Sequence, residues 1–258
     1  MAATAYPSPT IDYPTSDGRP MAETDLHREL MFETIHTLQW WFAADKMAYV
    51  SGNLLVFYEP GNRRRHLAPD VFVVKGVPNR KRNHYLIWEE GKGLDAVIEL
   101  TSQSTREEDI DDKKWLYRDV LRVGEYFLFD PRAEYLNPPL QGFRLVGGDY
   151  VPIEPVEGRL PSEVLGLHLE RQGTQLRFWN PVTNQYLPTM EERERQQAEA
   201  VENAELQIEL KEKARQEADK ARVEAEKERN REMEARKKLE EELARLRSQL
   251  GGGKPKND

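Results

Sequence analysis

Apolar and polar positions alternate over the first 188 residues in short runs broken by turn-forming residues, a pattern typical of a sheet with few helices. A helix is predicted for residues 22–45, because Thr24 is a suitable N-cap and leucine and tryptophan side chains follow at helical spacing. A second helix is predicted for residues 106–122, where Thr105 and Glu108 match a capping box. Strands are predicted in the following segments: 49–58, 68–74, 85–88, 94–100 and 125–130, with hairpins in 142–153 and 165–179. This order predicts an α+β fold, α/β/α-like, with a mixed central sheet and a helix against its middle.

Residues 189–250 have a different composition, rich in Ala, Glu, Lys, Arg and Gln and free of Gly and Pro. This composition predicts one continuous charged helix after a domain that spans residues 21–188 and ends at Pro188. Four leucines near the end of the helix step by four, three and four residues: Leu239, Leu243, Leu246 and Leu250. The same register is mostly charged in the middle of the helix, so we expect a solvated helix with a short coiled-coil end that forms a homodimer. Residues 1–20 and 251–258 are expected to be disordered tails.

The overall composition excludes several classes of protein. The 258 residues include no cysteine, which rules out disulfides, zinc sites built on thiolates and cysteine nucleophiles. No apolar run approaches the ~20 residues that span a bilayer, and the first residues lack the apolar segment of a secretory signal. We therefore expect a cytoplasmic protein that does not bind membranes.

The chain is acidic overall but contains clusters of basic residues. The chain has a net charge of −8, and residues 1–188 contain 21 Lys and Arg against 27 Asp and Glu, a net charge of −6. That balance argues mildly against nucleic-acid binding. Two basic triplets flank the strand at 68–74: Arg63, Arg64 and Arg65, and Arg80, Lys81 and Arg82. Basic triplets are most often solvated loops, but their position on both sides of an acidic site predicts contacts with phosphates.

Asp70, Glu99 and Lys113 carry the candidate chemistry. Asp70 follows a proline at the start of an apolar run, and Glu99 stands near the end of another. Lys113 lies near the centre of an apolar helical arc formed by five residues: Ile110, Leu116, Tyr117, Val120 and Leu121. A lysine there costs free energy unless its ammonium reaches water or a carboxylate, and pairing with Asp109 is one ordinary solution. Taken singly, the two acids also have ordinary interpretations, as a strand-start cap and a satisfied strand-end acid.

Together, the three residues are the minimum apparatus for metal-assisted hydrolysis of a phosphodiester. Mg²⁺ prefers oxygen ligands, which Asp70 and Glu99 would supply. The metal would lower the pKa of a bound water, and Lys113 would orient that water and stabilise the developing negative charge. This chemistry needs no serine or cysteine nucleophile, and it favours hydrolysis of a nucleic-acid backbone as the function.

Four motifs are similar to those of a known family. They are Pro69-Asp70, the run 97–105, Asp109-Ile-x-x-Lys113-x-x-x-Tyr117, and the run 125–131. Their combination, over roughly residues 21–188, resembles the Uma-type restriction endonuclease family of the PD-(D/E)XK nuclease superfamily. The resemblance implies a restriction-endonuclease-like core that cleaves phosphodiester bonds with Mg²⁺ or Mn²⁺ as cofactor. DNA is the expected substrate.

The resemblance also implies roles for individual residues. The metal-binding acids of the family correspond to Asp70 and Glu99. The superfamily lysine usually stands two residues after the second acid, where this chain has Thr101, so the lysine maps instead to Lys113 on the helix.

Other residues and other functions have weaker support. Glu33 and Glu59 are candidate auxiliary acids, and Tyr117 is predicted to belong to the core. The five histidines have no metal-ligand spacing, so we interpret them as structural or surface residues. One alternative function is a catalytically silent nuclease fold that acts as an interaction module through its charged helix. Another is a carbohydrate-active enzyme that uses the same two carboxylates as paired acids, which leaves the lysine without a role.

Overall fold

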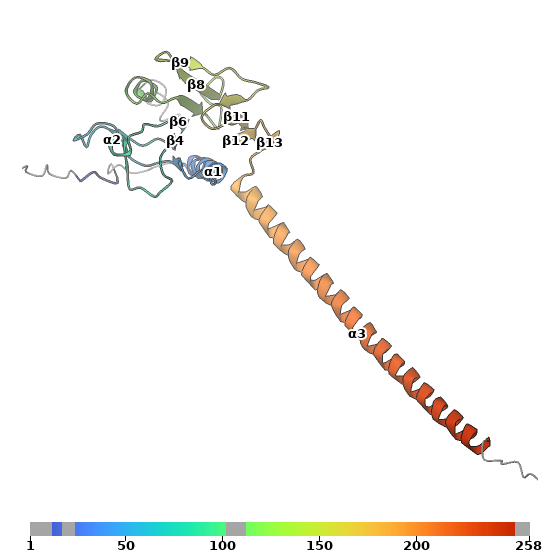
Figure 1. The fold of residues 1–258 in the computed structure, drawn as a ribbon. Coiled ribbons are helices and arrows are strands. Elements are labelled where there is room, and N and C mark those ends of the chain that lie inside the picture. The colour runs from blue at the N-terminus through green and yellow to red at the C-terminus, as the bar shows by residue number, and fades with distance from the viewer. Residues whose placement is uncertain (1–11, 17–23, 102–111, 251–258) are drawn as a thin grey trace, which may run out of the picture. The chain divides into compact units, whose positions relative to one another are not determined.

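The computed structural model describes residues 12–16, 24–101 and 112–250, and the chain divides into two compact units, residues 1–193 and 194–258. The first unit is a mixed α+β fold, and the second continues a long helix (Figure 1). Throughout the described residues, each helix is either too short or too polar to cross a lipid bilayer.

A six-stranded mixed sheet forms the centre of the first unit. Its strands, in spatial order, are β1 (Ala48–Ser51), β4 (Val71–Lys75), β6 (Ala96–Leu100), β7 (Glu125–Phe129), β8 (Leu140–Val146) and β9 (Asp149–Pro152). β6 and β7 run parallel, and the other neighbouring pairs are antiparallel. The predicted mixed sheet is confirmed, and its parallel pair requires a crossover connection, which is the segment that contains Lys113.

Alternate residues of the central strands belong to two separate cores. On one face, α1 (Asp25–Trp41) and a second sheet cover Val73, Ile98 and their neighbours. On the other face, Val97 packs with Tyr117 from the crossover helix. β6 and β7 are buried along their whole length because both faces are covered, which explains their nearly continuous apolar sequences.

α1 has the predicted N-cap, but it begins at Asp25 rather than at residue 22 and also ends earlier than predicted. The Thr24 hydroxyl accepts a hydrogen bond from the His27 amide at 3.2 Å, so Thr24 is the N-cap of the helix. The helix ends at Trp41 rather than at the predicted residue 45. Its buried side chains, Leu30, Met31, Thr34, Thr37 and Leu38, recur every three or four residues and form the face that packs on the sheet.

Two smaller sheets complete the first unit. The second sheet is antiparallel and contains β10 (Leu160–Ser162), β11 (Leu167–Gln172), β12 (Gln175–Asn180) and β13 (Gln185–Tyr186). The third contains β3 (His66–Leu67), β2 (Val56–Phe57) and β5 (Tyr85–Leu86), and the short α2 (Ile87–Glu90) follows it. The two predicted hairpins are confirmed as β8–β9 and β11–β12.

The strand predicted for residues 49–58 is wrong in one respect, because the structure divides it between two sheets. β1 pairs with β4, whereas β2 pairs with β3 and β5. The break falls at Gly52, where a Cβ atom would lie 1.9 Å from the carbonyl oxygen of Asp70. Only glycine permits so close an approach between two backbones, so the break is tied to the residue that precedes β4.

Residues 12–16 differ from the disordered tail predicted for residues 1–20. The Tyr13 ring is buried against Phe57 and Trp88, with ring centroids 4.9 and 5.4 Å apart. The Tyr13 hydroxyl accepts a hydrogen bond from the Gly61 amide at 2.7 Å. This short segment is therefore part of the folded unit and covers the third sheet.

The predicted helix at 106–122 is described from residue 112 onwards. The predicted residues before 112 lie outside the described residues, among them Thr105, Glu108, Asp109 and Ile110. The described part contains a π-helix, η2 (Leu116–Val120), in which the Leu121 amide donates to the Leu116 carbonyl at 3.0 Å. The wider turn changes the direction of the side chains that follow it. Val120, predicted to lie on the apolar arc, is 42% exposed, because that prediction assumed α-helical geometry throughout.

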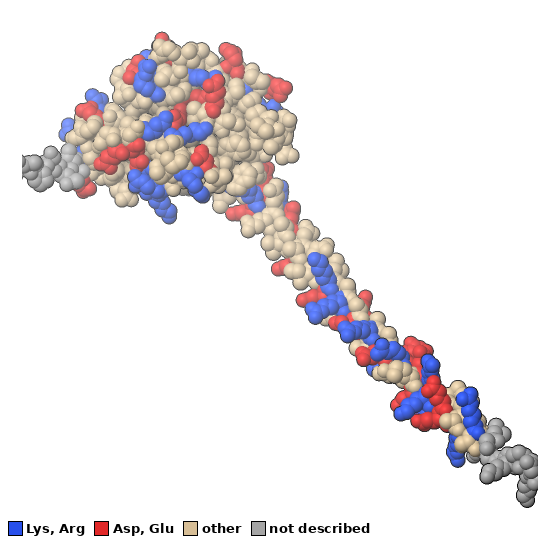
Figure 2. Space-filling model, in the orientation of Figure 1, with Lys and Arg blue, Asp and Glu red and all other residues tan. Residues whose placement is uncertain are grey.

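α3 (Met190–Leu250) is one helix of 61 residues, as the composition of this segment predicts. All its side chains from residue 194 to residue 248 are exposed. Basic and acidic side chains alternate along it (Figure 2), and some form ion pairs one turn apart, such as Glu209 and Lys213 at 2.7 Å. The coiled-coil end stays a prediction, and its described leucines are exposed in the single chain: Leu239, Leu243 and Leu246.

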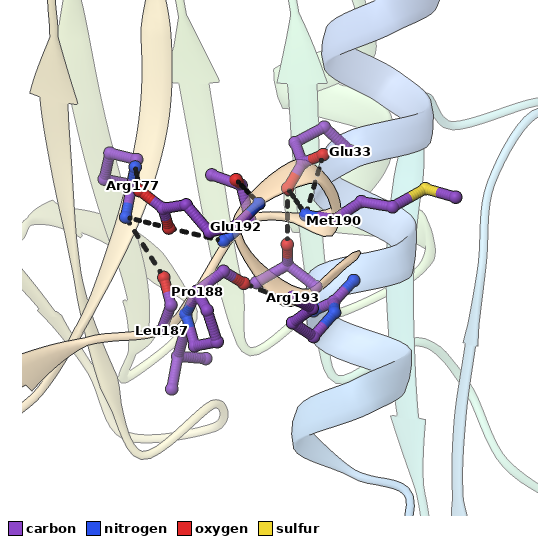
Figure 3. Close-up of polar contacts among 9 residues, drawn as sticks. Glu33, Arg177, Leu187, Pro188, Met190, Glu192 and Arg193 are labelled. Carbon is purple, nitrogen blue, oxygen red and sulfur yellow. Dashed lines mark hydrogen bonds and ion pairs between the residues drawn. The ribbon is translucent and has the colours of Figure 1, made fainter. Parts of the chain in front are cut away.

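The first turn of α3 is held by side chains of the first unit (Figure 3). Thr189 and Glu192 form a reciprocal capping box, in which each side chain accepts a hydrogen bond from the amide of the other, at 3.1 and 2.8 Å. The Glu33 carboxylate on α1 accepts a hydrogen bond from the Met190 amide at 3.0 Å, and Arg177 of β12 pairs with Glu192 at 3.0 Å. These contacts satisfy amides that a helix start leaves without intrahelical partners.

Candidate active site

The antiparallel pairing of β4 with β6 brings the two predicted acids together. Val71 pairs with Ile98, and one further step along this register places Asp70 opposite Glu99. Opposite residues of paired strands lie on the same side of a sheet. The Asp70 carboxylate also reaches the end of β6, where its Oδ2 accepts a hydrogen bond from the Leu100 amide at 2.8 Å. The fold thus joins two acids that are far apart in the sequence.

Glu99 is completely buried, and both of its carboxylate oxygens accept hydrogen bonds from the crossover helix. The Lys113 ammonium donates to Oε2 at 3.0 Å, and the Tyr117 hydroxyl donates to Oε1 at 2.5 Å. The Lys113 side chain is 21% exposed, so the cationic side of this cluster lies nearer to solvent than the carboxylate. A buried charge requires a partner of this kind, and Glu99 supplies the carboxylate that the position of Lys113 predicts.

Tyr117 acts as a hydrogen-bond donor because it keeps its proton. Burial raises the pKa of Tyr117 well above its ordinary value, and the negative charge of Glu99 raises it further. The charge of Asp70 has a smaller effect in the same direction. Both carboxylates therefore lie within electrostatic range of one hydroxyl.

His27 is a neighbour of Asp70 that sequence reasoning missed. Its Nε2 lies 3.3 Å from Asp70 Oδ1, and both side chains are largely buried. The sequence-based interpretation places His27 among structural or surface residues, because 43 positions separate it from Asp70 and no spacing links them. The one available signal was helical phase, since His27 precedes the buried Leu30 and Met31 by three and four residues.

Residues 4–178 match the model of the Uma2 family, described as "Putative restriction endonuclease", and the match covers well over half of the chain. This chain belongs to the Uma2 family. Family membership confirms the resemblance predicted from the motifs and supports nuclease activity in general. The chain is also similar to the crystal structure of a "putative nuclease belonging to DUF820" from Anabaena variabilis, with 17% identity, a TM-score of 0.43 and coverage of 58% of this chain and 80% of that chain. No curated protein sequence matches the chain.

The predicted nucleic-acid contacts of this Uma2 chain lie on two loops. Five of the six side chains are exposed: Arg63, Arg64, Arg65, Arg80 and Lys81. Two of these have acidic neighbours, since Arg65 lies 3.5 Å from Glu59 and Arg80 lies 2.9 Å from Glu90. Figure 2 shows a similar mixture of basic and acidic side chains over the visible face of the domain.

Arg82 differs from the other five basic residues because its side chain is only 2% exposed. It donates two hydrogen bonds to the Glu90 carboxylate, at 2.7 and 2.8 Å, and its guanidinium lies 4.1 Å from the centroid of the Tyr49 ring. Hydrogen bonds from Arg82 lower the pKa of Glu90. The geometry therefore gives Arg82 a role in stabilising its loop, in contrast to the phosphate contact predicted for it.

The candidate auxiliary acids of the Uma2 domain have partners elsewhere. Glu33 accepts hydrogen bonds at the start of α3, and Glu59 lies in the turn between β2 and β3. Thr101, at the usual position of the superfamily lysine, is buried and donates to the Phe129 carbonyl at 3.3 Å. Lys113 is thus the lysine that the fold brings to Glu99.

The oxygens of this Uma2 site suit a hard divalent cation. Asp70, which precedes β4, and Glu99 of β6 contribute carboxylates, and a carboxylate oxygen that accepts one hydrogen bond has a further lone pair. Within the described ranges, no three His, Asp or Glu side chains gather as a complete ligand set. Mg²⁺ typically takes one or two carboxylates from a protein and completes its shell with water and phosphate oxygens. The donor set fits that mode of binding.

Proposed function

We propose that this chain is a Mg²⁺- or Mn²⁺-dependent endonuclease that hydrolyses phosphodiester bonds in DNA. One observation supports the proposal above all: the fully buried carboxylate of Glu99, opposite Asp70, has its charge compensated by Lys113 at 3.0 Å. Buried ion pairs contribute little to stability compared with well-packed apolar residues. A functional reason for this cluster is therefore favoured over a purely structural one.

Each member of the cluster has a distinct proposed role. Asp70 and Glu99 would hold the cation through their carboxylate oxygens. When bound, the cation supplies a water of lowered pKa and neutralises negative charge on the phosphate. Lys113, at the partly exposed side of the cluster, would orient the attacking water and stabilise the charge that develops on the phosphate oxygens.

Exposed basic side chains are the proposed contacts with the DNA backbone. They lie on the loop between β2 and β3 and on the loop after β4: Arg63, Arg64, Arg65, Arg80 and Lys81. Contacts of this kind fix the position of the DNA without reading its sequence, and they weaken as salt increases. The cytoplasm stays the predicted location of this activity.

Cleavage of supercoiled plasmid DNA in the presence of Mg²⁺ tests the proposal with the full-length protein. Asp70→Asn, Glu99→Gln and Lys113→Met should each slow cleavage by about 100-fold or more, because each removes a charge next to the reacting phosphate. Chelation of divalent cations should abolish cleavage. Lys114→Met is the matched control: it changes the adjacent lysine, whose ammonium lies 3.5 Å from the centroid of the Phe143 ring, and should cleave at the wild-type rate.

Urea unfolding of each variant shows whether a lost activity reflects lost folding. A Glu99→Gln protein that cleaves at the wild-type rate would remove Glu99 from the mechanism. Cleavage that survives chelation would exclude a metal-dependent reaction.

A second candidate function, interaction through α3, is favoured by the exposed leucines near the end of that helix. Leu239, Leu243 and Leu246 fall on the a and d positions of a heptad. In the same register, Glu242 and Arg247 occupy g and e positions, where opposite charges attract across a parallel pair of helices. We propose that two copies of the chain pair along this segment, with or without catalysis by the domain.

The mass of the full-length protein in solution tests this pairing. Replacement of Leu239, Leu243 and Leu246 by glutamine should convert a dimer to a monomer. The control replaces three exposed apolar residues of α3 that lie off the seam: Leu206, Leu210 and Val223. A wild-type protein that remains monomeric at high concentration, or a dimer that survives the seam substitutions, would overturn the proposal.

A further inference from the structure

The Glu99 carboxylate accepts a hydrogen bond at each oxygen, one from the Tyr117 hydroxyl and one from the Lys113 ammonium. Tyr117 donates to Glu99 Oε1 at 2.5 Å, and Lys113 donates to Oε2 at 3.0 Å. The Tyr117 side chain is fully buried and packs on the Tyr126 ring, with centroids 5.0 Å apart. Because no part of Tyr117 is exposed, its effect on any bound substrate must pass through Glu99.

The two donors differ in how firmly they are held. Lys113 has a long, flexible side chain that is partly exposed, so by itself it leaves the carboxylate group of Glu99 able to turn. Rotation about the last bond of a glutamate side chain is broad and only weakly restrained. The Tyr117 ring, by contrast, is fixed by close packing, so its hydroxyl has a nearly constant position.

One helix supplies both donors, because residues four positions apart lie on the same face of a helix. Lys113 stands shortly before η2 and Tyr117 within it, four residues apart, and both side chains reach the same carboxylate. π-helical turns are rare and occur frequently at functional sites. The irregular turn is therefore associated with the pair of residues that contacts Glu99.

We propose that Tyr117 is the positioning residue for Glu99. Its hydroxyl fixes the plane of the carboxylate in the orientation in which Glu99 binds the divalent cation, an inference that rests on the function proposed above. Groups that orient metal ligands from behind typically contribute 10- to 100-fold to metal affinity. Tyr117 is not itself a catalytic residue.

Calorimetric titration of the full-length protein with Mg²⁺ or Mn²⁺, without DNA, measures this contribution directly. Tyr117→Phe keeps the packed ring and removes the hydroxyl, and it should weaken cation binding by about 10- to 100-fold. Tyr150→Phe is the matched control, since it removes the hydroxyl of another largely buried tyrosine, which bonds to the Val123 carbonyl at 3.1 Å. That control should bind the cation as the wild type does. In the cleavage assay, Tyr117→Phe should require more Mg²⁺ for half-maximal rate.

Separate outcomes decide the inference and the function on which it rests. If the wild type shows no cation binding that Glu99→Gln removes, the proposed function fails. If the wild type binds and Tyr117→Phe binds within about twofold of it, the positioning role is overturned.

A second measurement does not depend on the folding of Tyr117→Phe. Replacement of Tyr117 by 3-fluorotyrosine retains the hydroxyl and adds a fluorine signal next to it. Saturation with Mg²⁺ should shift that signal, and the shift should vanish with Glu99→Gln. A signal that does not respond to Mg²⁺ would contradict the positioning role.

Discussion

A lysine and a glutamate form an ion pair in both regions of the molecule, with different consequences. In the globular domain, Lys113 and Glu99 lie 3.0 Å apart with 21% and 0% of their side chains exposed, whereas in α3 Lys213 and Glu209 lie 2.7 Å apart with 65% and 60% exposed. Water and salt screen the pair in α3, so it adds at most a few tenths of a kcal/mol. The Glu99 carboxylate is not exposed to solvent, so its charge depends on its protein partners. Burial, and not distance, decides the importance of each pair.

The largest expected effect comes from one methyl group at Gly52. In Gly52→Ala the new Cβ would lie 1.9 Å from the Asp70 carbonyl oxygen and 2.7 Å from Ile35 Cδ1, so the backbone next to the candidate site must move. We expect a loss of about 3 kcal/mol in the free energy of unfolding. Ala198→Leu adds a larger group to the exposed surface of α3 and should change the free energy of unfolding by no more than about 0.5 kcal/mol.

Urea unfolding followed by tryptophan fluorescence measures both changes, because all five tryptophans precede residue 180 and report on the domain. Wild-type stability in Gly52→Ala would show that this part of the backbone yields easily, and the contrast between a rigid domain and a tolerant helix would then be wrong.

A smaller effect is expected when each ion pair loses its lysine. Lys113→Met leaves the buried Glu99 carboxylate with one donor fewer and should destabilise the domain by about 1–3 kcal/mol. Lys213→Met should reduce the local stability of α3 by less than about 0.5 kcal/mol, and the helix content should therefore fall only slightly. Urea unfolding measures the first effect, and circular dichroism at low and high salt measures the second. Equal effects of the two substitutions would remove burial as the deciding factor.

Counted for a single residue, the smallest expected effect is on stability at alkaline pH, and it is confined to the domain. Burial raises the pKa of Tyr85, Tyr117 and Tyr150 above the ordinary value of 10.0. The unfolded chain therefore loses these protons first, so the stabilisation is complete below pH 10 and decreases as the pH rises towards the folded pKa of each tyrosine. Between pH 10 and its folded pKa, each tyrosine lowers the free energy of unfolding by about 1.4 kcal/mol per pH unit. α3 contains no tyrosine and lacks this term.

Urea unfolding of the domain at a series of pH values above 9 measures this loss. Tyr150→Phe should remove one part of the slope and leave the remainder. A slope that Tyr150→Phe does not change would show that its hydroxyl ionises equally easily in the folded and unfolded chain.

Elements buried on two faces were predictable, and elements decided by long-range contacts were not. β6 and β7 have apolar sequences because both of their faces are covered, so their positions follow from the sequence. The division of residues 49–58 between two sheets depends on the approach of Gly52 to the Asp70 carbonyl, which no local pattern indicates. The π-turn at η2 likewise has no signal in hydrophobic spacing, and Val120 was misplaced for that reason.

The same distinction applies to the candidate site. Asp70 and Glu99 could be selected because each stands at one end of an apolar run, and Lys113 because it lies on an apolar helical face. The contact of His27 with Asp70 joins residues 43 positions apart, and no pattern in the sequence indicates that the two are neighbours. Arg82 was grouped with exposed basic residues, because the ring and carboxylate that bury it come from other segments.

Tyr13 has a consequence for the practical limits of the domain. Its ring covers Phe57 and Trp88, so a shortened protein that starts at α1 would leave two aromatic surfaces open to water. Uncovered aromatic patches of this kind promote aggregation. A version of this domain suited to purification and crystal growth should therefore begin before Tyr13, even though the first helix starts only at Asp25.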